Sequence, residues 1–133
     1  MSGTSQKYVD IGLLILRIGI GVMFIYHGLP KIMKGPQMWG ELGKAVGFFG
    51  ITFAPQFWGF MAAFAELFGG LAIISGTFFR TFCVLLTIEM VVASNMHLAK
   101  GDGLLTASHA IEMGIVFLSL IFTGPGKYAV GKF

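Results

Sequence analysis

Residues 57–79 read Phe-Trp-Gly-Phe-Met-Ala-Ala-Phe-Ala-Glu-Leu-Phe-Gly-Gly-Leu-Ala-Ile-Ile-Ser-Gly-Thr-Phe-Phe, and Glu66 is the one charged side chain among them. As an α-helix at about 1.5 Å per residue, this stretch would be roughly 34 Å long. That length is sufficient to cross a hydrocarbon layer of about 30 Å. The stretch therefore predicts a transmembrane helix that carries an acid near its middle.

The acid at position 66 needs protein or water around it rather than lipid. A carboxylate at the centre of a bilayer costs about 3 kcal/mol or more to insert. Small residues occupy the positions three and four residues away from Glu66 on both sides, and they are Ala62, Ala63, Gly69 and Gly70. Small residues on one helix face allow a second helix to approach closely. We therefore expect a neighbouring helix to supply the partner of Glu66.

The composition of the whole chain agrees with a membrane protein. Its 133 residues are 56% hydrophobic and 11% charged, with a mean hydropathy of +0.84. Such a chain is too apolar for a soluble domain of this size. The net charge of +3 comes from basic residues scattered singly along the chain, which favours lipid headgroups over nucleic acid as partners. Cys83 is the sole cysteine and lies in an apolar run, so no disulfide within the chain is expected.

The apolar segments predict an all-α membrane protein, a four-transmembrane-helix bundle that forms a single domain over residues 1–133. The predicted spans are residues 11–29, 57–79, 81–98 and 104–123. Between Pro36 and Pro55, apolar residues recur at helical spacing, which predicts a short interfacial or re-entrant helix between the first two spans. An even number of spans places both termini on one side, and we expect that side to be cytoplasmic.

Each predicted span carries one ionisable residue at a similar depth. Counted from one membrane face, about 12 to 15 Å of helix separates the face from each of them at 1.5 Å per residue. They are Arg17, Glu66, Glu89 and Glu112, and the histidines at positions 27, 97 and 109 lie nearer to the same face. We predict that Arg17 pairs with Glu66 or Glu112. Because one guanidinium cannot neutralise three carboxylates, the others must be protonated, hydrated or paired with histidine.

A buried group of carboxyl and imidazole side chains is suited to proton transfer. Reduction of a quinone consumes protons, and a pocket within a helix bundle could deliver them to the carbonyl oxygens. We expect Glu66, His109 and Glu112 to be catalytic candidates, and Arg17, His27 and Glu89 to bind the cofactor. A haem held by His97 and His109 is an alternative without a supporting motif. A metal site is not predicted, because span four has His109-x-x-Glu112 where a di-metal site would use Glu-x-x-His.

Several motifs along the chain resemble the DoxX family of small bacterial membrane proteins. They are Arg17, the segment Phe24-Ile-Tyr-His-Gly-Leu-Pro-Lys31, the segment Glu66-Leu-Phe-Gly-Gly70, Gly76, Arg80 and the segment Gly124-Pro-Gly-Lys-Tyr128. The resemblance implies a four-helix membrane bundle and a link to thiosulfate:quinone oxidoreduction and to membrane redox complexes that handle thiols. It also implies that Lys31, with Arg17, His27 and Glu66, belongs to the functional site, and it adds Lys31 to the cofactor-binding candidates.

Three functions are compatible with these observations. The first is a small subunit or component of a membrane redox system, with a quinone-like or other small apolar ligand in a buried Arg/Glu/His site. The second is a non-catalytic membrane subunit that docks or stabilises a larger respiratory or transport complex, in which the polar residues fasten helices together. The third is a proton-linked transporter or channel, although four spans without an inverted repeat leave little room for alternating access. Other membrane or redox subunits, or further copies of the chain, are the expected protein partners.

Overall fold

The computed structural model describes residues 2–131, so Met1 and residues 132–133 of the predicted single domain lie outside the described residues. The helices are α1 (Gly3–Met33), α2 (Pro36–Gly43), the 3₁₀ helix η1 (Lys44–Phe49), α3 (Pro55–Ser75), α4 (Phe79–Ala99) and α5 (Leu104–Thr123). Among the described residues, α1, α3, α4 and α5 are long and apolar enough to cross a membrane. This confirms the predicted all-α membrane fold, with a short helix after the first span.

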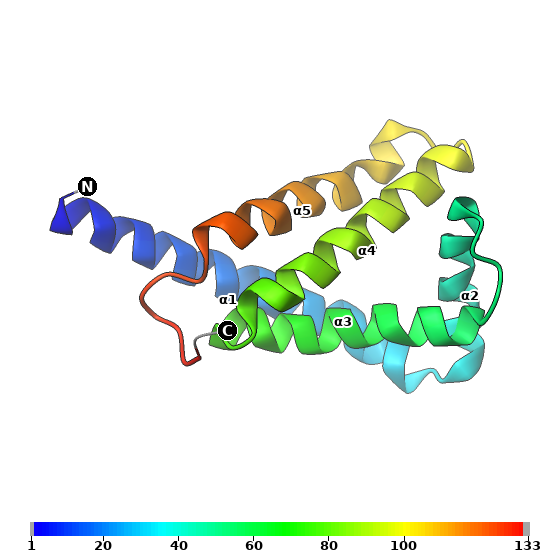
Figure 1. Cartoon of the computed structure of the whole chain (residues 1–133), viewed down its shortest axis with the longest axis horizontal. Helices are drawn as coiled ribbons and strands as arrows, with labels where there is room; N and C mark the ends of the chain where they lie inside the picture. Colours follow the sequence, from blue (N-terminus) through cyan, green and yellow to red (C-terminus); the bar gives the residue numbers. More distant parts are fainter. Residues whose placement is uncertain (1, 132–133) are drawn as a thin grey trace.

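The four long helices pack in the spatial order α1, α3, α4, α5 rather than as a closed ring. Helix α1 lies along α3 and helix α4 lies along α5, while α2 crosses the end of α3 (Figure 1). In the part of the chain that the structure describes, the backbones of α1 and α5 do not approach each other closely. The bundle is therefore open along the side between α1 and α5. The first turns of α1 and the segment that follows α5 lie toward the same end of the molecule (Figure 1).

Glycines determine how closely α1 packs on α3. A Cβ added to Gly21 would lie 2.7 Å from the Gly70 carbonyl oxygen, and one added to Gly28 would lie 2.6 Å from the Leu67 backbone nitrogen. Both distances are too short for a methyl group, so these positions require glycine for the observed helix separation. The small residues Gly69 and Gly70 thus allow close helix approach, as predicted. Gly70 lies against α1 at Gly21, and Gly69 lies against Leu86 of α4.

The helix boundaries differ from the predicted spans at several places. Helix α1 begins at Gly3 and continues through Pro30 to Met33, whereas the first span was predicted over residues 11–29. Helix α3 ends at Ser75, because Gly76 adopts a left-handed conformation with φ 83° and closes the helix. Arg80, predicted to follow the second span directly, lies in the first turn of α4. A tight antiparallel connection between these two spans is nevertheless present.

Helix α2 turns back and packs against the beginning of α3. The Trp39 ring lies 4.9 Å from the Phe60 ring, and a side chain at Gly59 would collide with the Trp39 carbonyl group. The Trp39 indole N–H also donates a hydrogen bond of 3.0 Å to the Lys31 carbonyl oxygen. Through this bond, α2 fixes the last turn of α1, which carries one of the charged residues of the candidate site.

Candidate functional site

An ion pair between α1 and α3 lies at the centre of the candidate site. The Lys31 ammonium group donates hydrogen bonds to both carboxylate oxygens of Glu66, each at 2.9 Å. The Glu66 side chain is 7% exposed and that of Lys31 is 30% exposed. Gly28, one turn before Lys31, lies directly against the Glu66 backbone and allows this short reach. Glu66 therefore does take its partner from a neighbouring helix, but that partner is Lys31.

Glu89 adds a second acid to this pair from α4. Its carboxyl group interacts with Glu66 through a side-chain hydrogen bond and also lies in the field of Lys31. Its other oxygen, Oε2, is buried and has no hydrogen-bond partner among the described residues. The cluster of Lys31, Glu66 and Glu89 therefore places two carboxyl groups beside one ammonium group inside the bundle.

A polar cavity of about 210 Å³ lies beside the ion pair. Its lining residues come from α1, α3, α4 and α5, and they are Phe24, His27, Lys31, Glu66, Met90, Ala93, His97, Thr106, His109 and Ala110. Nδ1 of His97 also lies 2.9 Å from a carboxylate oxygen of Asp102 in the loop before α5. The cavity thus brings all three histidines to the Lys31–Glu66 pair.

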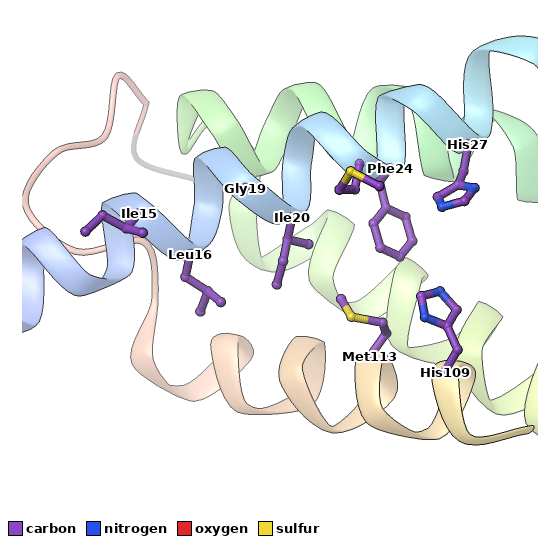
Figure 2. Close-up of a pocket in the computed structure, with 9 residues that line it drawn as sticks. Ile15, Leu16, Gly19, Ile20, Phe24, His27, His109 and Met113 are labelled. Atoms are coloured by element: carbon purple, nitrogen blue, oxygen red, sulfur yellow. The ribbon is translucent and has the colours of Figure 1, made fainter. Parts of the chain in front are cut away.

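A larger apolar groove of about 440 Å³ lies next to this cavity, between α1 and α5. It is lined by Ile15, Leu16, Gly19, Ile20, Met23, Phe24, His27, His109 and Met113. The imidazoles of His27 and His109 face each other across one end of the groove, with their ring centres 6.3 Å apart (Figure 2). The cavity and the groove lie side by side, because Phe24, His27 and His109 line both of them. A partly polar cavity inside the bundle therefore adjoins an apolar groove between α1 and α5.

The prediction that Arg17 pairs with Glu66 or Glu112 is wrong. The Arg17 side chain is 1% exposed and donates hydrogen bonds of 2.6 to 3.0 Å to backbone carbonyl oxygens only. The acceptors are Ile73 and Ile74 at the end of α3, and Pro125 and Tyr128 in the C-terminal segment. These carbonyls lack partners in the helix itself, so the guanidinium caps the helix and ties down the segment after α5.

Glu112 also lies away from the candidate site. Its side chain is exposed on the outer surface of α5, and it makes no hydrogen bond or ion pair within residues 2–131. Of the predicted site residues, the structure brings together His27, Lys31, Glu66, Glu89 and His109, whereas Arg17 and Glu112 are separate. The depth argument failed for Arg17, because α1 extends past residue 29 and is shifted along α3 relative to the predicted register.

Two polar residues with structural importance were not predicted from the sequence. Asp10, which directly precedes the first predicted span, is 5% exposed and accepts a hydrogen bond of 3.2 Å from the Lys127 backbone N–H. Thr106 lines the polar cavity but lies in an apolar stretch without any motif. The sequence did contain a signal for Asp10. This acid directly precedes the apolar run and lies within helical reach of Arg17. Thr106 carried no signal in the sequence alone.

Comparison with known proteins identifies the chain's relatives. The family model described as DoxX matches residues 12–99. An uncharacterised protein from Haemophilus influenzae is 32% identical, with 94% of this chain and 92% of the relative covered. The inner membrane protein YqjF of Escherichia coli is 30% identical, with 96% and 95% covered. These matches, together with the four apolar helices, establish a multi-pass protein of the bacterial inner membrane.

A third relative bears a name that refers to an activity. It is the "Putative oxidoreductase CatD" of Bacillus subtilis, which is 33% identical over 90 residues. The match covers 66% of this chain and 60% of that protein. No solved structure matches the chain.

Proposed function

The chain belongs to the DoxX family of membrane proteins, and from this premise we propose that it binds a quinone-like lipid as part of a membrane redox system. The observation that carries the proposal is the partly polar cavity with the apolar groove directly beside it. A polar cavity with Lys31, His27 and His109 suits a head group that bears carbonyl oxygens, and the apolar groove between α1 and α5 suits a hydrocarbon tail. Membrane ligands of this shape could enter from the lipid, because the groove lies on the open side of the bundle.

The groups around the cavity are suited to proton delivery. The Lys31 ammonium and the imidazoles of His27 and His109 can donate hydrogen bonds to a carbonyl oxygen. When electrons reach the ligand from a partner redox protein, each carbonyl oxygen gains a proton, and these side chains are the nearby donors. The acid pair of Glu66 and Glu89 provides a store from which they can be reprotonated. The name of the CatD relative agrees with a redox role.

The alternative proposal is a non-catalytic subunit that docks or stabilises a larger complex. The observation in its favour is the Lys31–Glu66 ion pair, which is complete without a ligand and fastens α1 to α3. In that case the cavity would be a consequence of packing, and occupation of the groove by ordinary lipid acyl chains would suffice.

Binding of a short-chain benzoquinone tests the proposal, and Trp39 provides the signal. In a Trp58→Phe background, quenching of the Trp39 fluorescence reports binding near Lys31, because the indole is hydrogen-bonded to the Lys31 carbonyl. We expect Gly19→Leu, which fills the groove, to weaken binding by about tenfold or more, equivalent to about 1.4 kcal/mol. Gly12→Leu is the matched control, since both glycines lie on α1 with open space beside them and only Gly19 lines the groove.

The affinity of His109→Ala separates the two proposals further. Loss of the imidazole removes one head-group donor and should weaken binding of the quinone, while the control Glu112→Gln should leave binding unchanged. Equal affinity in Gly19→Leu, Gly12→Leu and the parent protein would contradict the quinone proposal and support the docking role.

A further inference from the structure

A stripe of residues runs along the outward face of α5. It consists of Leu105, Ser108, Glu112, Ile115, Ser119 and Phe122, and is called the outer stripe below. Successive members are three or four residues apart in strict alternation, which places them on one side of the helix. The buried residues of α5 occupy the opposite side, where Ala107, Ala110, Phe117 and Leu120 pack into the bundle. The outer stripe thus faces directly away from the rest of the chain.

Half of the residues on this face are polar, and one of them is an acid, which a lipid-facing surface does not favour. Glu112 lies near the middle of α5 and is exposed, and it has no hydrogen bond or ion pair in the described part of the chain. Polar residues one and two turns away, Ser108 and Ser119, share its side of the helix. An acid exposed to hydrocarbon at this depth lowers the insertion equilibrium by more than about a hundredfold, equivalent to about 3 kcal/mol on insertion scales. Another helix must therefore cover the stripe.

We propose that a second copy of this chain covers the outer stripe, so that two α5 helices pack in parallel about a twofold axis perpendicular to the membrane. When two helices pack in a left-handed supercoil, the contact residues on each helix alternate three and four positions apart, and the outer stripe has this spacing. A second copy inserted with the same orientation supplies the same spacing at the same depth. The backbone of α5 approaches only α4 closely within the described chain, so the outer side is free to receive it.

The chemistry of the stripe is self-complementary under this symmetry. Glu112 would lie opposite Glu112 of the partner subunit, and two protonated carboxyl groups donate to and accept from each other. The Ser108 and Ser119 hydroxyls already donate to their own helix, at 2.6 Å to the Leu105 carbonyl and 2.8 Å to the Ile115 carbonyl. Their oxygens remain available as hydrogen-bond acceptors on this face. Polar side chains of this kind stabilise helix pairs in membranes.

Cysteine cross-linking in native membranes tests the pairing without detergent. Ser119→Cys lies in the outer stripe and should form a disulfide-linked homodimer on mild oxidation, detectable as twice the monomer mass. Ile88→Cys is the matched control, because Ile88 is exposed on α4 outside the stripe. Cys83 is completely buried and can remain in all variants. A cross-link of Ser119→Cys to a different protein, or equal dimer yields for both positions, would overturn the proposal.

Substitution of the acid supplies the second measurement. In the Ser119→Cys background, Glu112→Leu should lower the dimer yield by about tenfold, because it removes the hydrogen bonds across the interface. Glu112→Gln should retain the dimer, since a carboxamide also donates and accepts with its own copy. Glu112 makes no contact that folding of the monomer requires, so correctly inserted protein is expected in both variants. An unchanged dimer yield in Glu112→Leu would refute the role of the acid.

Discussion

Lys31 and Glu66 serve two purposes in the same contact. Their hydrogen bonds join α1 to α3, and the ammonium group also lines the cavity in which a ligand head group would lie. An isolated acid inside the bundle would be costly, and the lysine removes that cost as long as both residues are present. A ligand that accepts a hydrogen bond from Lys31 must therefore share the ammonium group with Glu66.

Removal of Lys31 alone should destabilise the protein more than removal of the whole pair. Lys31→Met leaves Glu66 buried without its cation, and we expect a loss of about 3 kcal/mol in the free energy of unfolding. The double variant Lys31→Met with Glu66→Gln should recover a large part of that loss, because no charge then lacks a partner. Unfolding by SDS titration from mixed micelles measures both. A double variant that loses as much stability as Lys31→Met alone, or more, would show that the pair is not coupled.

Arg17 should be important for folding rather than for ligand binding. Lysine cannot reproduce the planar set of donors that reaches the carbonyls of Ile73, Ile74, Pro125 and Tyr128. We expect Arg17→Lys to cost about 3 kcal/mol or more in stability. The folded fraction should bind the quinone with parent affinity. Arg80→Lys is the control, because exposed Arg80 has one such bond, to the Ile121 carbonyl, and should change stability little.

At the scale of the helices, the register of α1 on α3 decides which residues meet. Gly21 and Gly70 place the two backbones in contact, and Gly28 brings the end of α1 to Glu66. Gly21→Leu should force α1 away from α3 and lower the unfolding free energy by at least about 2 kcal/mol, as overpacking does in well-packed cores. Gly12→Leu, on the same helix without neighbours, should have no such effect. SDS titration of the two variants checks this, and similar stabilities would contradict the close approach.

The sequence was sufficient to predict the number, type and approximate bounds of the helices. Long apolar stretches and the proline and glycine positions carried that information, and α5 was predicted at its observed bounds of 104–123. The relative shift of α1 and α3 could not be predicted, because Pro30 suggested a helix end where the structure continues for one more turn. Without that shift, Arg17 was predicted at the depth of Glu66, although it lies at the C-terminal end of α3 beside Ile73 and Ile74.

The candidate site was predicted in part for the same reason. Glu66, His27 and His109 followed from polar residues within apolar spans, and Lys31 came from the family resemblance. The direction of each side chain around its helix was harder to predict, because a span that is apolar on all sides gives no indication of its buried face. Glu112 was therefore assigned to the interior, although it faces outward on α5.

At the scale of the whole molecule, the open side between α1 and α5 is the distinguishing feature. The helices pack successively from α1 through α3 and α4 to α5, and the rings of Phe24 and Phe117, 5.0 Å apart, bridge the gap between the first and last. The apolar groove lies on this side of the bundle, between α1 and α5. The outer stripe of α5 points away from the bundle, so pairing through it is compatible with an accessible groove.

Four transmembrane helices also fix the relative location of the two termini. The first turns of α1 and the segment after α5 lie toward the same end of the molecule (Figure 1), and we expect both termini in the cytoplasm. Fusions to a reporter that is active only in the cytoplasm, placed in turn at each end of the chain, measure this. Activity of both fusions is the expected result. Activity of one alone would contradict the four-span topology, and inactivity of both would reverse the predicted orientation.

Photoaffinity labelling tests the central claim most directly. A photoreactive benzoquinone with a hydrocarbon tail, applied to the protein in native membranes and followed by peptide mass spectrometry, reports which residues contact the ligand. We predict adducts on α1 and α5 at groove residues such as Met23 and Met113, reduced by excess unlabelled quinone and by Gly19→Leu but not by Gly12→Leu. Labelling that is distributed over the lipid-facing surfaces of α3 and α4, or that does not respond to competition, would contradict a quinone site between α1 and α5.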